Sequence, residues 1–227
     1  MKKILIAAAI LALVFTGSGW ATTITIDRVN GYYSGNGGEF NIAGYGGWTM
    51  SLYDTKALVN NRYGQLGFES FCLETDETVN IPGIYDAALN SNNQAVGGGS
   101  NTNSGDTISE GTAFLYLEFA KGTLSGYNYG AGRSTSAGLL QNAIWWLEDE
   151  NWGSENIFTA AVIAQFGSSA AAKADYTGND VGVLNLTALR SGAVAQDQLV
   201  LTPVPEAGTL LLLGLGLAGV GILRRKK

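Results

Sequence analysis

The residues best suited to chemistry in this sequence are one thiol and one side-chain amide. The chain has a single cysteine, Cys72, and no histidine, which excludes Ser-His-Asp and Cys-His catalysis, histidine-ligated metals and any disulfide within the chain. If the Cys72 sulfur attacks the amide carbonyl of Gln141 and ammonia leaves, the product is an internal thioester. Well-aligned groups in one fold reach effective molarities of about 10⁵ M or more, which an electrophile as weak as an amide requires.

A purely structural role for the same two residues stays open. A free cysteine is often a small apolar residue buried on a strand, and a glutamine can be a polar residue on a helix whose other side chains face the core. The two interpretations of Cys72 and Gln141 differ in whether a covalent bond joins them.

The sequence around the pair resembles that of bacterial surface thioester domains. Residues 71–74 (FCLE) place the cysteine between an aromatic and an apolar residue, and residues 140–145 (LQNAIW) follow an apolar-Gln-x-x-apolar-Trp pattern. The resemblance implies covalent adhesion, in which an amine of a target, often a lysine side chain, attacks the thioester and is left bonded to the acyl carbon of Gln141. A protein of this kind is an adhesin, not an enzyme, and needs no cofactor or metal.

Four neighbours in the two motifs are expected to form the environment of the bond: Phe71, Glu74, Asn142 and Trp145. Glu74 and Asn142 are candidates for orienting the reacting groups or restraining hydrolysis. Trp145 is a candidate for shielding the bond from water.

Residues 1–21 have the three parts of a secretory signal peptide. Lys2 and Lys3 precede an apolar run, and small residues then lead to a predicted cleavage after Ala21. Because the apolar run is too short to span a membrane easily, we expect a signal peptidase to remove the segment and the mature protein to leave the cytoplasm.

Residues 204–227 form a second targeting segment. Val204, Pro205 and Glu206 come first, and an uncharged run follows over 207–223. The chain then ends in four basic residues, namely Arg224, Arg225, Lys226 and Lys227. As a helix the run covers roughly 25 Å, close to the hydrocarbon core of about 30 Å, which predicts a transmembrane helix with its basic end in the cytoplasm.

This order of Pro-Glu, apolar helix and basic cluster resembles the PEP-CTERM sorting signal of Gram-negative, exopolysaccharide-producing bacteria. The resemblance implies transient anchoring in the inner membrane and processing by an exosortase, a membrane protease that cuts near Pro205 and Glu206. The protein is then released or transferred to the cell surface or extracellular matrix. An ordinary tail anchor is the alternative.

The mature part, residues 22–203, has the length of one domain and is strongly acidic. It keeps 7 of the 13 basic and 18 of the 19 acidic residues, a formal net charge of −11. A surface of this sign repels phosphate backbones, so nucleic acid is excluded as a partner.

The hydrophobic pattern of the mature part predicts an α+β fold. Short alternating runs between 22 and 80, and again beyond 176, are typical of antiparallel strands. The polar, Gly-rich segment 89–105 predicts a long exposed loop. Between these regions the spacing predicts about three helices, of which the first is preceded by a possible capping box at Thr107 and Glu110. We therefore expect an antiparallel β-sandwich or barrel with a helical insertion.

Other candidate sites are weaker. The carboxylates of Glu74, Asp76 and Glu77 lack the spacing of a calcium loop, and residues 148–150 (EDE) fan around a predicted solvated helix end. Trp145, Trp146 and Trp152 could form a platform for a sugar ring. The alternative function to covalent adhesion is accordingly a non-catalytic structural or carbohydrate-associated protein of an exopolysaccharide or biofilm matrix.

Overall fold

The computed structural model describes residues 22–44, 58–97 and 105–202. The predicted signal peptide 1–21, the targeting segment 204–227 and the predicted transmembrane helix 207–223 lie outside the described residues. Within those described ranges, no helix is both long and apolar enough to cross a membrane.

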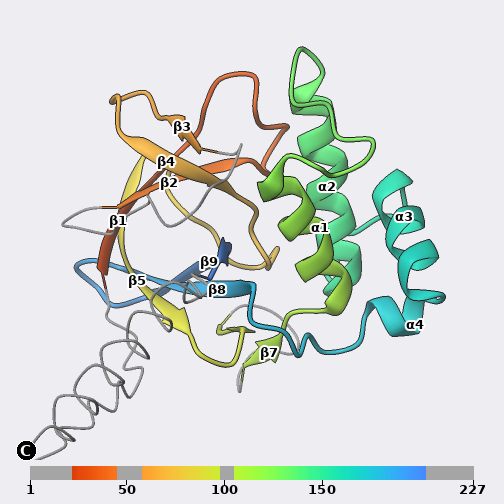
Figure 1. The fold of residues 1–227 in the computed structure, drawn as a ribbon. Coiled ribbons are helices and arrows are strands. Elements are labelled where there is room, and N and C mark those ends of the chain that lie inside the picture. Colours follow the sequence, from red (N-terminus) through yellow and green to blue (C-terminus); the bar gives the residue numbers. More distant parts are fainter. Residues whose placement is uncertain (1–21, 45–57, 98–104, 203–227) are drawn as a thin grey trace, which may run out of the picture.

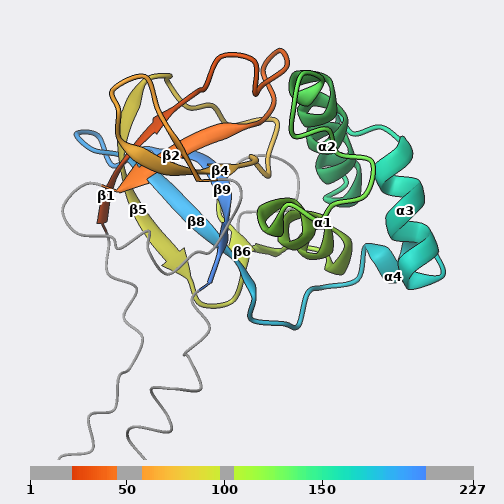
Figure 2. The same cartoon turned by 45° about the horizontal axis from the view of Figure 1, so that its top comes forward.

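The fold is α+β, as predicted, with its strands gathered on one side and its helices on the other (Figures 1 and 2). Seven strands form one antiparallel sheet in the order β3-β4-β2-β1-β5-β8-β9. Their bounds are β1 Thr22–Asp27, β2 Phe40–Gly44, β3 Leu58–Asn60, β4 Leu66–Ser70, β5 Gly83–Asn90, β8 Val181–Ala188 and β9 Val194–Leu201. Two short strands, β6 Gln94–Ala95 and β7 Asp106–Thr107, pair separately.

The main sheet curls until the segment after β4 reaches β9, the strand at the far end of the order. Leu73 N donates to Asp197 O at 3.2 Å, Leu199 N donates to Phe71 O at 3.1 Å, and Cys72 bridges Gln198. The contact is an isolated bridge, so the barrel is not closed, and the alternative of two stacked sheets is wrong. We call this meeting of residues 71–73 with β9 the seam.

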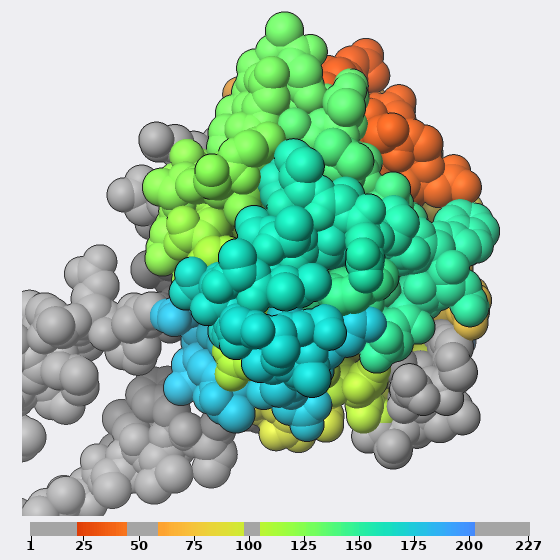
Figure 3. Space-filling model, turned by 90° about the vertical axis from the view of Figure 1, so that its right-hand side faces the viewer, coloured from red at the N-terminus to blue at the C-terminus, as the bar shows by residue number. Residues whose placement is uncertain are grey.

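Four helices are inserted between β7 and β8, one more than the approximate number predicted. They are α1 Glu110–Lys121, α2 Arg133–Leu147, α3 Ile157–Phe166 and the single turn α4 Ser169–Ala172. Figure 3 shows α3 and α4 (teal) lying over α1 and α2 (green) on this side of the molecule. The insertion therefore presents α1 and α2 to the sheet.

The predicted capping box at Thr107 is wrong. Thr107 belongs to β7, and the chain turns into α1 only at Ser109, whose side chain accepts from Thr112 N. Gly122 ends the helix with φ of 70°, a left-handed conformation that glycine adopts without a steric cost.

The predicted loop 89–105 is also partly wrong, because it contains the end of β5 and all of β6. β5 was missed altogether. It lies between β1 and β8 in the sheet, so distant strands on both sides provide its hydrogen bonds.

Two hydrophobic cores meet at the seam. One fills the space between helices and sheet and includes Phe71, Leu73 and Leu140; the other lies inside the curled sheet and includes Cys72 and Trp145. Because side chains alternate along an extended chain, residues 71–73 face the two cores in turn. Cys72 is thereby directed into the sheet core.

Candidate functional site

Cys72 and Gln141 come together where α2 covers the end of the sheet core. Both side chains have 0% exposure. Gln141 and Trp145 are one turn apart and share a face of α2, which directs them toward the sheet core, whereas Leu140 and Ile144 belong to the core between helices and sheet. The tertiary structure thus joins two motifs that are 69 residues apart.

The amide of Gln141 forms hydrogen bonds to the backbone and the thiol around it. Gln141 Oε1 accepts from Gly38 N at 3.0 Å, from Cys72 N at 3.3 Å and from Cys72 Sγ at 3.3 Å. Gln141 Nε2 donates to Cys72 O at 2.8 Å. These contacts fix which end of the amide is oxygen and hold the carbonyl beside the sulfur.

Two backbone N–H groups aimed at one carbonyl oxygen form the arrangement that stabilises negative charge during acyl transfer. When a nucleophile adds to the Gln141 carbonyl, charge develops on Oε1, to which Gly38 N and Cys72 N already donate. The donors are fixed by the seam and by the start of β2, so little reorganisation is needed.

The Cys72 thiol keeps its proton at neutral pH. Burial raises the pKa of Cys72, the Glu74 carboxyl raises it further, and Arg28 and the Trp145 indole act in the opposite direction. Any attack by this sulfur must therefore move the thiol proton to another atom, for which the departing amide nitrogen is available.

Two glycines allow the chain before β2 to lie directly on the pair. A Cβ on Gly37 would stand 2.6 Å from Gln141 Cγ, and one on Gly38 would stand 2.3 Å from the ring of Phe71. Side chains at these positions would push the two motifs apart. The Gly-rich sequence around Gly37 and Gly38 predicts only turns between strands, so their close packing against Gln141 and Phe71 was missed.

A buried ion pair joins the next residue, Glu39, to the start of α2. Arg133 donates from Nε at 2.7 Å and from Nη2 at 2.6 Å to the Glu39 carboxylate, which also accepts from Tyr127 Oη at 2.6 Å. The guanidinium lies 3.7 Å from the ring centroid of Tyr32. Sequence reasoning missed this pair; its only signal was a charged residue, Arg133, in an otherwise uncharged helix.

The structure separates the four predicted neighbours of the bond. Trp145 is 6% exposed and, like Gln141, lies beside Gly37. Phe71 lies beside Gly38 and packs edge-on against Phe119, with 5.0 Å between the ring centroids. Asn142 lines a hollow beside Gln141. Glu74 instead accepts from Asp197 N at 3.1 Å, and its other oxygen has no hydrogen-bond partner, so it does not hold the reacting groups in place.

Glu74 belongs to a second buried cluster at the seam. Burial and the neighbouring Asp197 raise the pKa of Glu74 to about 9, and burial raises the pKa of Asp197 to about 7. Asp197 accepts from Leu186 N, Val96 N and Asn185 Nδ2. The hydrogen bonds of Asp197 join β9 to β8 next to Cys72.

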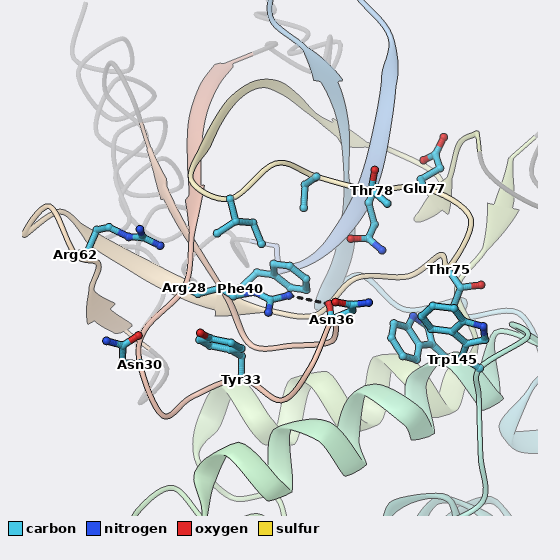
Figure 4. A pocket seen from close by; sticks show the side chains of 14 residues that line it. Arg28, Asn30, Tyr33, Asn36, Phe40, Arg62, Thr75, Glu77, Thr78 and Trp145 are labelled. Carbon is cyan, nitrogen blue, oxygen red and sulfur yellow. Dashed lines mark hydrogen bonds between the residues drawn. The ribbon is translucent and has the colours of Figure 1, made fainter.

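A hollow of about 190 Å³ reaches Gln141 and adjoins a larger cleft of about 480 Å³. Asn36, Trp145 and Trp152 line both. Figure 4 shows the larger cleft above α2, with Tyr33 and Asn36 on one chain segment and Thr75 on another. A small molecule in the cleft therefore lies close to the hollow that Gln141 lines.

The acidic candidates have structural roles. Glu148 accepts from Ser109 N and Oγ at the start of α1, and Glu150 accepts from Thr75 N and Oγ1, so residues 148–150 are not simply a solvated helix end. Across the part of the chain that the structure describes, no three carboxylates or thiols converge as a metal site would require.

Comparison with known proteins bears on the C-terminal segment. Residues 203–226 match the PEP-CTERM protein-sorting motif. The match supports an exosortase substrate that is exported and sorted to the surface or extracellular space. No curated protein and no solved structure matches the chain, so the assignment of the PEP-CTERM motif does not extend to the domain that precedes it.

Proposed function

We propose that this PEP-CTERM protein is a surface or matrix adhesin that forms an internal thioester between Cys72 and Gln141 and bonds covalently to amines. The observation that carries the proposal is the geometry at Gln141 Oε1, where the Cys72 sulfur stands 3.3 Å away and two backbone N–H groups donate to the same oxygen.

The bond-forming step is an exchange of one acyl bond for another. The Cys72 sulfur adds to the Gln141 carbonyl carbon, and negative charge on Oε1 is stabilised by Gly38 N and Cys72 N. The carbonyl re-forms as the C–N bond breaks, and the thiol proton leaves with the nitrogen as ammonia. No oxidant, cofactor or metal takes part.

The adhesive step reverses the roles of sulfur and nitrogen. An unprotonated amine reaches the thioester carbon through the hollow lined by Asn142 and Trp145. The new C–N bond forms at the Gln141 acyl carbon, the C–S bond breaks, and the Cys72 thiol regains a proton from the amine. Because an amide is more stable than a thioester, attachment to the amine is favoured. Formation of the thioester runs against this difference and is drawn forward by the departure of ammonia, which is protonated and diluted in solution.

Burial supports the storage of such a bond before a target arrives. Cys72 and Gln141 are inaccessible to bulk water, and Trp145 lines the hollow beside Gln141. A thioester exposed to solvent would be lost to hydrolysis, whereas this position limits access to groups that enter the hollow.

The second candidate is an inert structural protein of the extracellular matrix. The same burial favours it, because a protonated thiol at 0% exposure packs as a small apolar residue in the sheet core. In that case the Gln141 amide only joins α2 to the seam.

Intact-mass spectrometry of the exported protein separates the two candidates. We expect the mass to be about 17 Da below that of its sequence, the ammonia lost on acylation, and a methylamine adduct to replace the deficit after treatment. Cys72→Ala and Gln141→Ala should each abolish both effects, while Gln165→Ala, which alters an exposed glutamine of α3, should retain them. A full sequence mass, with a Cys72 thiol that is alkylated once the protein is unfolded, would overturn the adhesin and favour the inert matrix protein.

A further inference from the structure

Resting on the proposed function, we infer that the amine carried to Gln141 belongs to an amino sugar of a glycan, and that the 480 Å³ cleft holds the adjoining sugar residues. The cleft and the hollow beside Gln141 share Trp152, Trp145 and Asn36. A ligand chain lying in the cleft is therefore positioned to place one substituent against the thioester.

The aromatic surface available in the cleft suits a sugar ring. Trp152 is 59% exposed, and its ring is perpendicular to that of the buried Trp145 at 6.1 Å between centroids. A pyranose has an apolar face of C–H groups that stacks on such an indole, while its hydroxyls remain free for polar contacts. An exposed tryptophan at the junction of two cavities otherwise leaves apolar area in water.

The other two aromatic rings of the cleft are already occupied. The Arg28 guanidinium lies 4.5 Å from the centroid of Tyr33 and 4.7 Å from that of Phe40, and it donates to the carbonyls of Gly35 and Asn36. Through these hydrogen bonds Arg28 holds the loop that carries Asn36, a residue that lines the cleft. Stacking of a ligand ring falls to the tryptophan end, which is the end nearest Gln141.

The polar lining matches hydroxyl groups better than a cation. Side-chain amides and hydroxyls line the walls at Asn30, Asn36, Thr78 and Gln196, together with one carboxylate, Glu77. Of the two guanidinium groups, Arg62 is paired with Asp27 and Arg28 braces its loop. A lysine ammonium finds no excess of negative charge in this lining.

The chemistry of the attack also favours an amino sugar over lysine. Only the free base is a nucleophile, and with a pKa near 10.4 roughly one lysine amine in a few thousand is unprotonated at pH 7. The electronegative oxygens of a sugar ring lower the basicity of its amine, so a much larger fraction is free base. At long range, the net charge of −11 over residues 22–203 attracts a polycationic amino-glycan and a lysine-rich target alike, so the preference for an amino sugar rests on the free-base fraction and the cleft.

The test compares amines that need the cleft with one that does not. Full-length protein in detergent is treated with methylamine, a glucosamine trisaccharide or a lysine tripeptide at equal free-base concentration, and release of the Cys72 thiol and adduct mass are followed. We expect the trisaccharide to react about tenfold faster than methylamine, because binding raises its local concentration. Its fully N-acetylated form has no amine and should inhibit the trisaccharide without forming an adduct.

Trp152→Ala should lower the ratio of the trisaccharide rate to the methylamine rate about fivefold, the loss of one stacked ring. Tyr63→Ala is the matched control, because Tyr63 is a 60% exposed aromatic residue outside the cleft lining. Equal rates for trisaccharide and methylamine, an unaffected Trp152→Ala variant, or faster reaction of the lysine tripeptide would each overturn the amino-sugar assignment. Absence of any methylamine adduct would instead overturn the thioester itself.

Discussion

Arg133 and Gln141 lie about two turns apart on α2, and each connects the helix to one of two adjacent residues before β2. Arg133 pairs with the Glu39 carboxylate through two hydrogen bonds, and Gln141 accepts from the neighbouring Gly38 N. One link is ionic and the other is a neutral amide. Both links are buried, but only Gln141 has a nucleophile, the Cys72 sulfur, beside its acceptor oxygen.

The difference lies in what faces each acceptor. The Glu39 carboxylate accepts hydrogen bonds from Arg133 and Tyr127, so the contact is electrostatic. The Gln141 carbonyl faces two N–H donors and a sulfur, so the donors that hold it also polarise it toward attack. A buried polar contact becomes reactive when a nucleophile takes the place of one ordinary partner.

Opening the thioester should produce the largest change in stability. The bond would close a loop of about 70 residues in a chain that has no disulfide, and by analogy with a disulfide this constrains the unfolded state by about 4 kcal/mol. We expect methylamine treatment to lower Tm by roughly 10 °C in calorimetry. The Cys72→Ala variant is the control and should show no methylamine effect; a shift of the same size in that variant would contradict the crosslink.

Breaking the ionic link should have the next largest effect. Arg133→Met leaves Glu39 buried without its cation, which costs about 3 kcal/mol in the free energy of unfolding, measured by urea denaturation. Because both N–H donors to Gln141 are backbone groups, we expect this variant to keep the deficit of about 17 Da. Arg190→Met, a change at an exposed arginine, should leave stability unchanged, and loss of the mass deficit in Arg133→Met alone would show that the two links are not separable.

The acid cluster at the seam should give the smallest effect, visible as a pH dependence. The pKa of Glu74 is raised to about 9 in the fold, so protonated Glu74 favours the folded state. This contribution is complete below pH 4.5 and is lost as the pH rises toward 9. We expect Glu74→Gln to flatten the decline in unfolding free energy between pH 5 and 9, measured by urea denaturation across this range, while Glu155→Gln, at an exposed position, leaves the slope intact.

The sequence was informative wherever the signal is local. Alternating runs between 22 and 80 and beyond 176 predicted the strands β1, β2, β4, β8 and β9, and the longer spacing between these regions predicted the helical insertion. The PEP-CTERM segment was identified from residues that are adjacent in the chain and matches the sorting motif. Each of these features depends on neighbours within a few residues, so one sequence suffices.

Identification of Cys72 and Gln141 as partners also came from the sequence, through the two short motifs and the lack of other thiols or histidines. What the sequence did not contain is the carbonyl's environment. The Gly38 N donor, the Arg133–Glu39 pair, the β5 strand and the cleft at Trp152 were decided only by the tertiary structure. They arise from segments far apart in the chain whose meeting depends on how the sheet curls and where α2 packs, and no local pattern encodes that geometry.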